Sequence, residues 1–200
     1  SRLDYNHPGD GSHVEPYDPE RVSLPPVGSK PVPLERVLNE ETWDLLRPDV
    51  LLADADVVQW RRENEPVSVY MDRRLESDGI LRRGFLERLF HAGVLSFAVR
   101  RRGEIAPFFV SKKKRKQRLV LDCRQVNQQF RKPPRPELGA AEVYRDLEAE
   151  GAAQLFIGEA DIQNCFYQRG IPAWLCEFFG FRAESASWAR ELGASLDVWG

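Results

Sequence analysis

Two features in the second half of the chain combine residue types and spacings that could perform chemistry. The first is a run of cations at residues 112–118, which lies between two apolar stretches. Cations held on a hairpin can meet a triphosphate without a long search by each side chain, and their hydrogen bonds to phosphate are charge-assisted. The second is Asp161, which ends another apolar stretch. A carboxylate at the end of a strand can hold Mg²⁺, an oxygen-seeking cation, against the phosphates of a substrate.

Short apolar runs bounded by turn residues predict the strands that would carry these groups. The predicted strands cover residues 94–99, 105–110, 118–122, 155–161 and 166–171. A turn at 100–103 and a basic loop at 112–116 would connect the first three strands, and the last strand would return antiparallel to the one before it. Asp122 and Arg124 are two positions apart, so on a strand they would share one face.

Helices are predicted beside these strands. Residues 78–93 have an apolar stripe at helical spacing, with Asp78 as the N-terminal cap and Gly93 at the end, and residues 140–150 also have a helical pattern. Because the helices and the antiparallel strands occur in separate clusters, the predicted fold class is α+β rather than a wound parallel sheet.

The N-terminal part of the chain shows no chemistry of its own. Residues 1–33 hold seven of the fourteen prolines and few apolar residues, which predicts an extended or disordered tail. Residues 34–78 mix apolar spacings of three and four with acidic residues, which predicts a helical supporting region. Asp54 and Asp56 within it are expected to be exposed to solvent, because helix positions two apart do not face each other.

The composition excludes several classes of protein. Hydrophobic residues make up 42% and charged residues 30%, and no run approaches the ~18 apolar residues of a membrane span, so no membrane partner is expected. The three cysteines form no Cys-x-x-Cys, and the three histidines are far apart. These features argue against a disulfide framework or a zinc knuckle, and they favour an intracellular, reducing compartment. A nuclear location is compatible with the basic run but is not indicated by anything else.

Charge is distributed very unevenly along the chain. Residues 100–135 contain thirteen Lys and Arg against two acidic residues, a net charge of +11. Since the whole chain carries −2, the remainder carries −13. Such asymmetry indicates a polyanionic partner for the basic segment.

The order of the residues in this basic segment resembles the fingers subdomain of reverse transcriptases, the RNA-directed DNA polymerases of retroelements. In that family an apolar strand is followed by Lys-Lys, by an Arg six after the first Lys, by an Asp four after that Arg, and by Arg and Asn two and five further on. The matching residues are Lys112, Lys113, Arg118, Asp122, Arg124 and Asn127. The resemblance implies that Lys112 or Lys113, together with Arg118, contacts the triphosphate of an incoming dNTP. It also implies that the last three residues support the fingers.

The resemblance extends to the first palm motif of that family, an Asp followed by three residues, a small residue and an aromatic. Asp161, Cys165 and Phe166 match this motif. The resemblance implies that Asp161 is a catalytic Mg²⁺ ligand and that the backbone carbonyl of Ile162 lies near a second metal position. It further implies that Phe166 stacks under the sugar and excludes a 2′-hydroxyl. Tyr167 would point the other way on an extended segment.

The chain departs from the family after this motif. Phosphoryl transfer by two metal ions about 3.5–4 Å apart needs further carboxylates. The family takes these from a later aromatic-x-Asp-Asp hairpin, but this chain contains no Asp-Asp dipeptide. Residues 182–200 are unlike the family. The expectation is therefore a partial right-hand polymerase over residues 79–181, with fingers and the start of the palm, that is a truncated and inactive copy.

The resemblance implies partners as well as a cofactor: an RNA or DNA template-primer, dNTP and Mg²⁺. A different class of function fits the same charges, namely a non-catalytic nucleic-acid-binding module that uses residues 100–135. A third interpretation is a related polymerase that makes RNA, or a telomerase-like enzyme. Phe166 disfavours RNA synthesis, because small residues at that position admit ribose. The oligomeric state is not indicated by the sequence.

Overall fold

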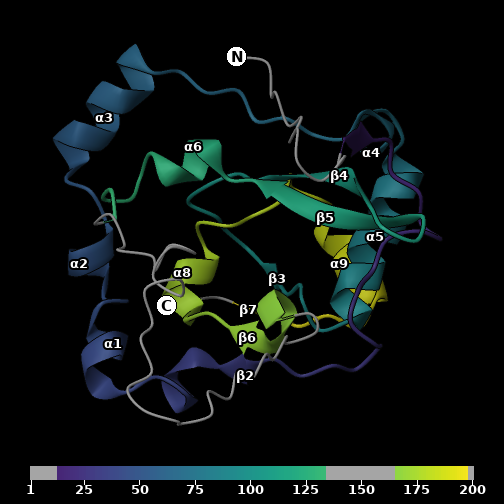
Figure 1. Ribbon diagram of the computed structural model, residues 1–200, viewed down its shortest axis with the longest axis horizontal. Helices are drawn as coiled ribbons and strands as arrows, with labels where there is room; N and C mark the ends of the chain where they lie inside the picture. Colours follow the sequence, from purple (N-terminus) through teal and green to yellow (C-terminus); the bar gives the residue numbers. More distant parts are fainter. Residues whose placement is uncertain (1–12, 134–164, 198–200) are drawn as a thin grey trace, which may run out of the picture. The chain divides into compact units, whose positions relative to one another are not determined.

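The structure, a computed structural model, describes residues 13–133 and 165–197 (Figure 1). The chain divides into two compact units, of which the first comprises residues 1–131 and 164–200 and the second residues 132–163. Nearly all of the second unit lies outside the described residues, and with it lie the predicted helix at 140–150 and the predicted strand at 155–161. The described part combines helices with short strands, which confirms the α+β prediction at this level.

An antiparallel hairpin forms the centre of the first unit. Strand β4 (Ala106–Lys112) pairs with β5 (Lys116–Asp122), in register from Ala106 opposite Asp122 to Lys112 opposite Lys116. Both strands were expected, and each is longer than predicted by two residues at its end near the turn. The short strand β1 (Val14–Glu15) adds antiparallel to β4, so the sheet order is β1-β4-β5.

Two helices pack against this sheet, as Figure 1 shows. Helix α4 (Arg73–Ser77) leads directly into α5 (Gly79–His91). The predicted cap is confirmed, because the Asp78 carboxylate accepts hydrogen bonds from the backbone N–H groups of Ile80 and Leu81. Gly93, with φ of 71°, lies just beyond the C-cap of α5, where a left-handed residue lets the chain turn away.

The main hydrophobic core lies between α5 and the sheet. Its fully buried members come from three segments of the chain: Tyr17, Val22, Leu75, Phe85, Leu86, Leu89 and Phe109. The rings of Tyr17, Phe85 and Phe109 are in mutual contact, with centroids 4.8–5.6 Å apart.

Residues 13–23, here called the N-terminal strap, are not the tail that the sequence predicts. Tyr17 is 1% exposed and Val22 is 6% exposed, and both belong to the core. The strap is largely extended, as the prediction of an extended or disordered tail over 1–33 allows, but it is packed into the core instead of being a free tail. Its few apolar residues can be buried because α4, α5 and β4 supply the rest of the core.

The helices between residues 34 and 65 form a separate arm. They are η1 (Leu34–Arg36), α1 (Glu40–Asp44), α2 (Pro48–Leu51) and α3 (Ala55–Asn64), and none of them contains a buried residue. Asp54, the N-cap of α3, and Asp56 are exposed, as expected. Arg61 ties α3 to the rest of the unit through hydrogen bonds of 2.9 Å to the carbonyls of Gln128 and Phe130.

A second, smaller core lies where β5 leads into helix α6 (Arg124–Asn127). Ile105, Val126 and Phe178 are its buried members. Phe178 follows helix α8 (Ala173–Cys176) in the C-terminal part of the chain.

Two predicted strands pair differently from the expectation. Residues 97–98 form β3, which pairs parallel with β7 (Leu196–Asp197) instead of forming a hairpin with β4. The ring of Phe97 lies between Phe90 of α5 and Trp188 of helix α9 (Ala186–Glu191), which directs β3 away from β4. These aromatic contacts are long-range, so the local pattern does not predict them.

The predicted strand at 166–171 is wrong over most of its length, and the segment 155–161 with which it was expected to pair lies outside the described residues. The 3₁₀-helix η2 (Cys165–Gln168) occupies most of it, followed by β6 (Arg169–Gly170), which pairs parallel with β2 (Val32–Pro33). Within the described ranges, no helix is both long and apolar enough to cross a membrane.

Candidate functional site

The turn of the β4–β5 hairpin gathers the basic residues that the sequence singles out. Lys112 lies opposite Lys116, and Val110 lies opposite Arg118. Because residues two apart on a strand share a face, Lys112, Lys116 and Arg118 lie on one face of the hairpin, and all three are exposed. Lys113 lies in the turn itself and is exposed as well. The structure therefore brings together the three predicted phosphate contacts Lys112, Lys113 and Arg118.

The turn has an unusual backbone. Lys114 has φ of 61° and Arg115 has φ of 58°, the left-handed region that non-glycine residues avoid at a cost of about 1–2 kcal/mol each. A hairpin turn of this kind normally carries Asn or Gly. A lysine and an arginine occupy these positions instead, so the turn has positive charge at two positions where glycine would be more favourable.

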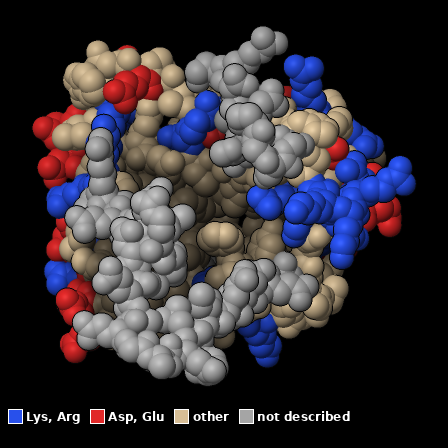
Figure 2. Space-filling view, in the orientation of Figure 1, with Lys and Arg blue, Asp and Glu red and all other residues tan. Residues whose placement is uncertain are grey.

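Within the described residues, the cations of the turn form no ion pair with an acidic side chain. None of the ion pairs formed among residues 13–133 and 165–197 includes a lysine or arginine from 112–118. Figure 2 shows Lys and Arg gathered over the turn between β4 and β5. Like charges held this close repel one another, and a polyanion would relieve that repulsion.

Asp122 and Arg124 form the opposite end of the same hairpin. The Asp122 carboxylate accepts hydrogen bonds from the backbone N–H groups of Tyr70 (2.8 Å) and Arg124 (3.1 Å). It also accepts from the Arg124 guanidinium, at 2.9 Å from Nε and 2.7 Å from Nη2. Burial alone would raise the pKa of Asp122, but these hydrogen bonds outweigh it and hold the pKa below its ordinary value. The arrangement ties β5 to α6 and to the segment before α4, with Arg124 in α6 rather than on the strand.

The predicted metal ligands belong to the part of the chain that the structure does not describe. Asp161 and Ile162 lie outside the described residues, so their roles stay predictions. Phe166 is described, and it is 94% exposed in η2, which leaves its ring free to contact a ligand. Tyr167 beside it is half-buried, and burial raises the pKa of its hydroxyl. In the part of the chain that the structure describes, no group of three or more His, Cys, Asp or Glu could hold a metal ion.

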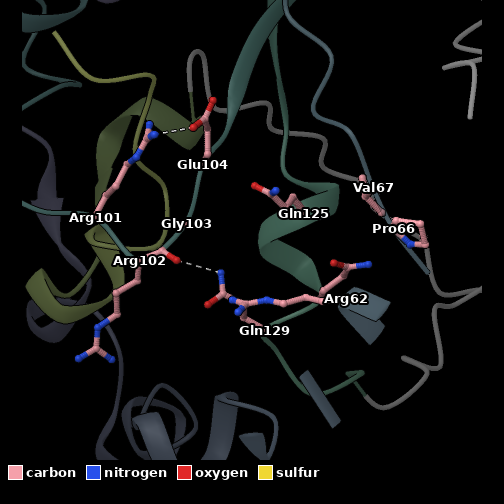
Figure 3. Close-up of a pocket in the computed structure, with 10 residues that line it drawn as sticks. Arg62, Pro66, Val67, Arg101, Arg102, Gly103, Glu104, Gln125 and Gln129 are labelled. Carbon is pink, nitrogen blue, oxygen red and sulfur yellow. Dashed lines mark hydrogen bonds and ion pairs between the residues drawn. The ribbon is translucent and has the colours of Figure 1, made fainter. Parts of the chain in front are cut away.

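A pocket of about 420 Å³ lies near α6 and was not anticipated from the sequence (Figure 3). The polar residues that line it include Arg62 from α3, Arg101 and Glu104 from the loop before β4, and Gln125 and Gln129. Arg101 pairs with Glu104 at 2.5 Å, and Gln129 donates to the carbonyl of Arg102. The three glutamines at 125, 128 and 129 are the only sequence signal, and they are too common a feature to have indicated a pocket.

Comparison of the chain with protein-family models, with curated proteins and with solved structures found no match. What the site can do chemically therefore has to follow from its own residues. Those residues form an exposed cationic turn, supported at the other end of the hairpin by a buried carboxylate, and this arrangement can bind a chain of phosphates.

Proposed function

We propose that the β4–β5 turn binds the triphosphate of a nucleotide, as the fingers of a polymerase of the reverse transcriptase type would. Lys112, Lys113 and Arg118 contact the phosphates in this proposal. The observation that supports it most is the register of the hairpin, which sets Lys112 and Arg118 on one exposed face without an acidic partner among the described ion pairs. Three cations in such a cluster would offset much of the negative charge of a triphosphate, and each can donate charge-assisted hydrogen bonds to it.

The remaining parts of the proposal come from the palm motif. Asp161 would hold Mg²⁺, with the carbonyl of Ile162 near a second metal position. The metal would neutralise the phosphates and polarise the reacting oxygen. Phe166 would contact the sugar, for which its exposed ring is suitable. Because the chain contains no Asp-Asp dipeptide, we expect nucleotide binding without primer extension.

The test of the triphosphate site is the affinity for dTTP, measured by equilibrium dialysis in Mg²⁺. Lys112→Ala combined with Arg118→Ala should weaken binding about tenfold or more, which is about 1.4 kcal/mol. The matched control is Lys30→Ala with Arg73→Ala, two exposed cations that also have no acidic partner among the described ion pairs. Equal affinities of the two double variants would contradict the proposal.

A second candidate function is nucleic-acid binding without chemistry. The same exposed cations favour it, because phosphate contacts of this kind supply non-specific affinity. Asp161→Ala separates the two functions. It should abolish the Mg²⁺ dependence of dTTP binding under the polymerase proposal, and leave oligonucleotide binding unchanged under the second. Robust extension of a primer on an RNA template by the chain would contradict the expectation that it is inactive by itself.

A further inference from the structure

We infer that the N-terminal strap positions the basic turn of the β4–β5 hairpin, and that Arg21 is the residue through which it does so. Arg21 does not belong to the set of residues that the resemblance assigns. This inference deepens the proposed function and rests on it in one respect. The conformation of the turn is followed through the binding of a chain of phosphates, which is the ligand of the proposed function.

Arg21 joins the strap to the turn at two points. Its Nε donates a hydrogen bond of 2.7 Å to the carbonyl of Arg115, one of the two left-handed residues of the turn. Its Nη2 lies 2.7 Å from Oε2 of Glu15, which belongs to β1. The ion pair is partly shielded from water, since the side chains of Arg21 and Glu15 are 32% and 18% exposed, whereas the hydrogen bond to the Arg115 carbonyl is exposed. Arg21 therefore holds the peptide group at the point where the turn is most strained.

Gln117 fixes the strap against β5 next to the turn. This side chain is 0% exposed, and its amide nitrogen donates to the carbonyl of Pro16 at 2.8 Å while its oxygen accepts from the backbone N–H of Asp18 at 3.0 Å. The Gln117 backbone is also engaged, because its N–H donates to the carbonyl of Arg21. Since Gln117 points into the strap, its neighbours Lys116 and Arg118 must point to the other face of the strand.

The turn needs such support for two reasons. Lys114 and Arg115 have a left-handed backbone conformation, which is unfavourable for residues other than glycine. In addition, the surrounding cations repel one another. The charge of Arg21 does not add to this repulsion in full, because Glu15 pairs with it. Arg21 is therefore placed to act by holding the backbone rather than by attracting the anion.

The experiment is a double-mutant cycle read by the affinity for inorganic tripolyphosphate. Arg21→Met keeps the apolar stem but removes the donors, and it should weaken binding about fivefold. Arg115→Gly relieves the strain at the same turn position, and Arg115 is not one of the proposed phosphate contacts. In the Arg115→Gly background, Arg21→Met should therefore have little further effect.

An electrostatic role of Arg21 would produce the opposite result. If Arg21 only attracted the anion, Arg21→Met would weaken binding by the same factor in both backgrounds, and that outcome would overturn the inference. Unchanged affinity of Arg21→Met in the wild-type background would overturn it as well.

Hydrogen exchange separates this inference from the proposed function. Arg21→Met should speed the exchange of the backbone amides at 113–116 while those of α5 keep their protection, which also shows that the variant is folded. If the wild-type chain fails to bind dTTP or tripolyphosphate, the proposed function is wrong. The exchange measurement still decides whether the strap holds the turn, and unchanged exchange at 113–116 would show that it does not.

Discussion

Asp122 and Arg124 are joined through both carboxylate oxygens: Arg124 Nε lies 2.9 Å from Oδ1, and Nη2 lies 2.7 Å from Oδ2. The Asp122 side chain is 1% exposed, and that of Arg124 is 31% exposed. The same carboxylate receives the backbone N–H of Tyr70, so it connects β5, α6 and the segment before α4. This single buried group fixes the base of the hairpin whose turn carries the proposed phosphate contacts.

The first prediction concerns this carboxylate. Asp122→Asn removes the charge and presents an amide N–H₂ to groups that are themselves donors. The free energy of unfolding, measured by urea denaturation, should fall by about 2–4 kcal/mol. Asp54→Asn is the matched control, since Asp54 and Arg131 form an exposed pair at 3.5 Å that should contribute less than about 1 kcal/mol. Equal losses in the two variants would show that Asp122 is not a structural support.

The second prediction concerns the buried amide that fixes the strap. Gln117→Leu keeps the volume but leaves the Pro16 carbonyl and the Asp18 N–H without their partner. Such unsatisfied groups cost about 1–3 kcal/mol each when they stay buried, so the urea midpoint should fall clearly. Gln125→Leu, at an exposed position of α6, should change the stability by no more than about 0.5 kcal/mol. A fully stable Gln117→Leu protein would mean that the Gln117 amide is not needed to hold the strap, which Asp72 and Arg74 also contact.

The third prediction is the loss of stability in acid. Burial would raise the pKa values of Asp122 and Glu184, but the hydrogen bonds from Arg124 to the former and from Arg82 and Arg83 to the latter outweigh it, so both pKa values are lowered. A carboxyl with a lowered folded pKa stabilises the chain above the unfolded pKa of about 4. That stabilisation is lost as the pH falls through the lower folded value.

The measurement is the urea midpoint between pH 7 and pH 2. It should be nearly constant down to about pH 5 and then fall steeply as these two carboxylates are protonated. The urea midpoint of Asp122→Asn should be lower at pH 7 and should fall less in acid, because one of these two carboxylates is gone. A variant that falls as steeply as the wild type would exclude Asp122 as a contributor.

The fourth prediction concerns two glycines, one inside helix α5 and one just beyond its C-terminal end. Gly84 lies inside α5 with nothing near the position of an added Cβ, so Gly84→Ala should stabilise the chain by about 0.5–1 kcal/mol. Gly93 has a left-handed backbone, and an added Cβ would collide with the carbonyl of Ser29. Gly93→Ala should therefore destabilise it. Melting temperatures of the two variants that shift in the same direction would contradict this geometry.

The fifth prediction concerns the exposed ring of Phe166. Because this side chain is 94% exposed, Phe166→Ala should change the free energy of unfolding by less than about 0.5 kcal/mol. If the ring contacts the sugar, the same variant should bind UTP and dTTP with more similar affinities than the wild type. If a stable variant discriminates between UTP and dTTP as strongly as the wild type does, Phe166 does not exclude the 2′-hydroxyl.

Local patterns predicted the elements whose partners are close in sequence. The hairpin is an example, because β4 and β5 are joined by the turn itself and their register follows from it. Helix α5 is another, since Asp78 caps it and a glycine follows its end. The predicted phosphate contacts Lys112, Lys113 and Arg118 came together for the same reason.

Long-range pairings could not be predicted in this way. Strands of two residues, such as β3 and β6, are too short to show a pattern, and their partners lie 99 residues away in one case and 137 in the other. The burial of Tyr17 likewise depends on how α5 and β4 pack together, and the residues next to Tyr17 in the sequence give no sign of that packing.

The amino-acid sequence by itself therefore determined the cationic turn, its position on a hairpin and the cap of its neighbouring helix, because each depends on residues within a few positions of one another. Only the tertiary structure decided that Arg21 and Gln117 hold that turn from the strap, and that β3 and β6 pair with distant strands. Such contacts are set by which apolar and polar surfaces remain uncovered once the local elements have formed, and that is a property of the whole packed chain.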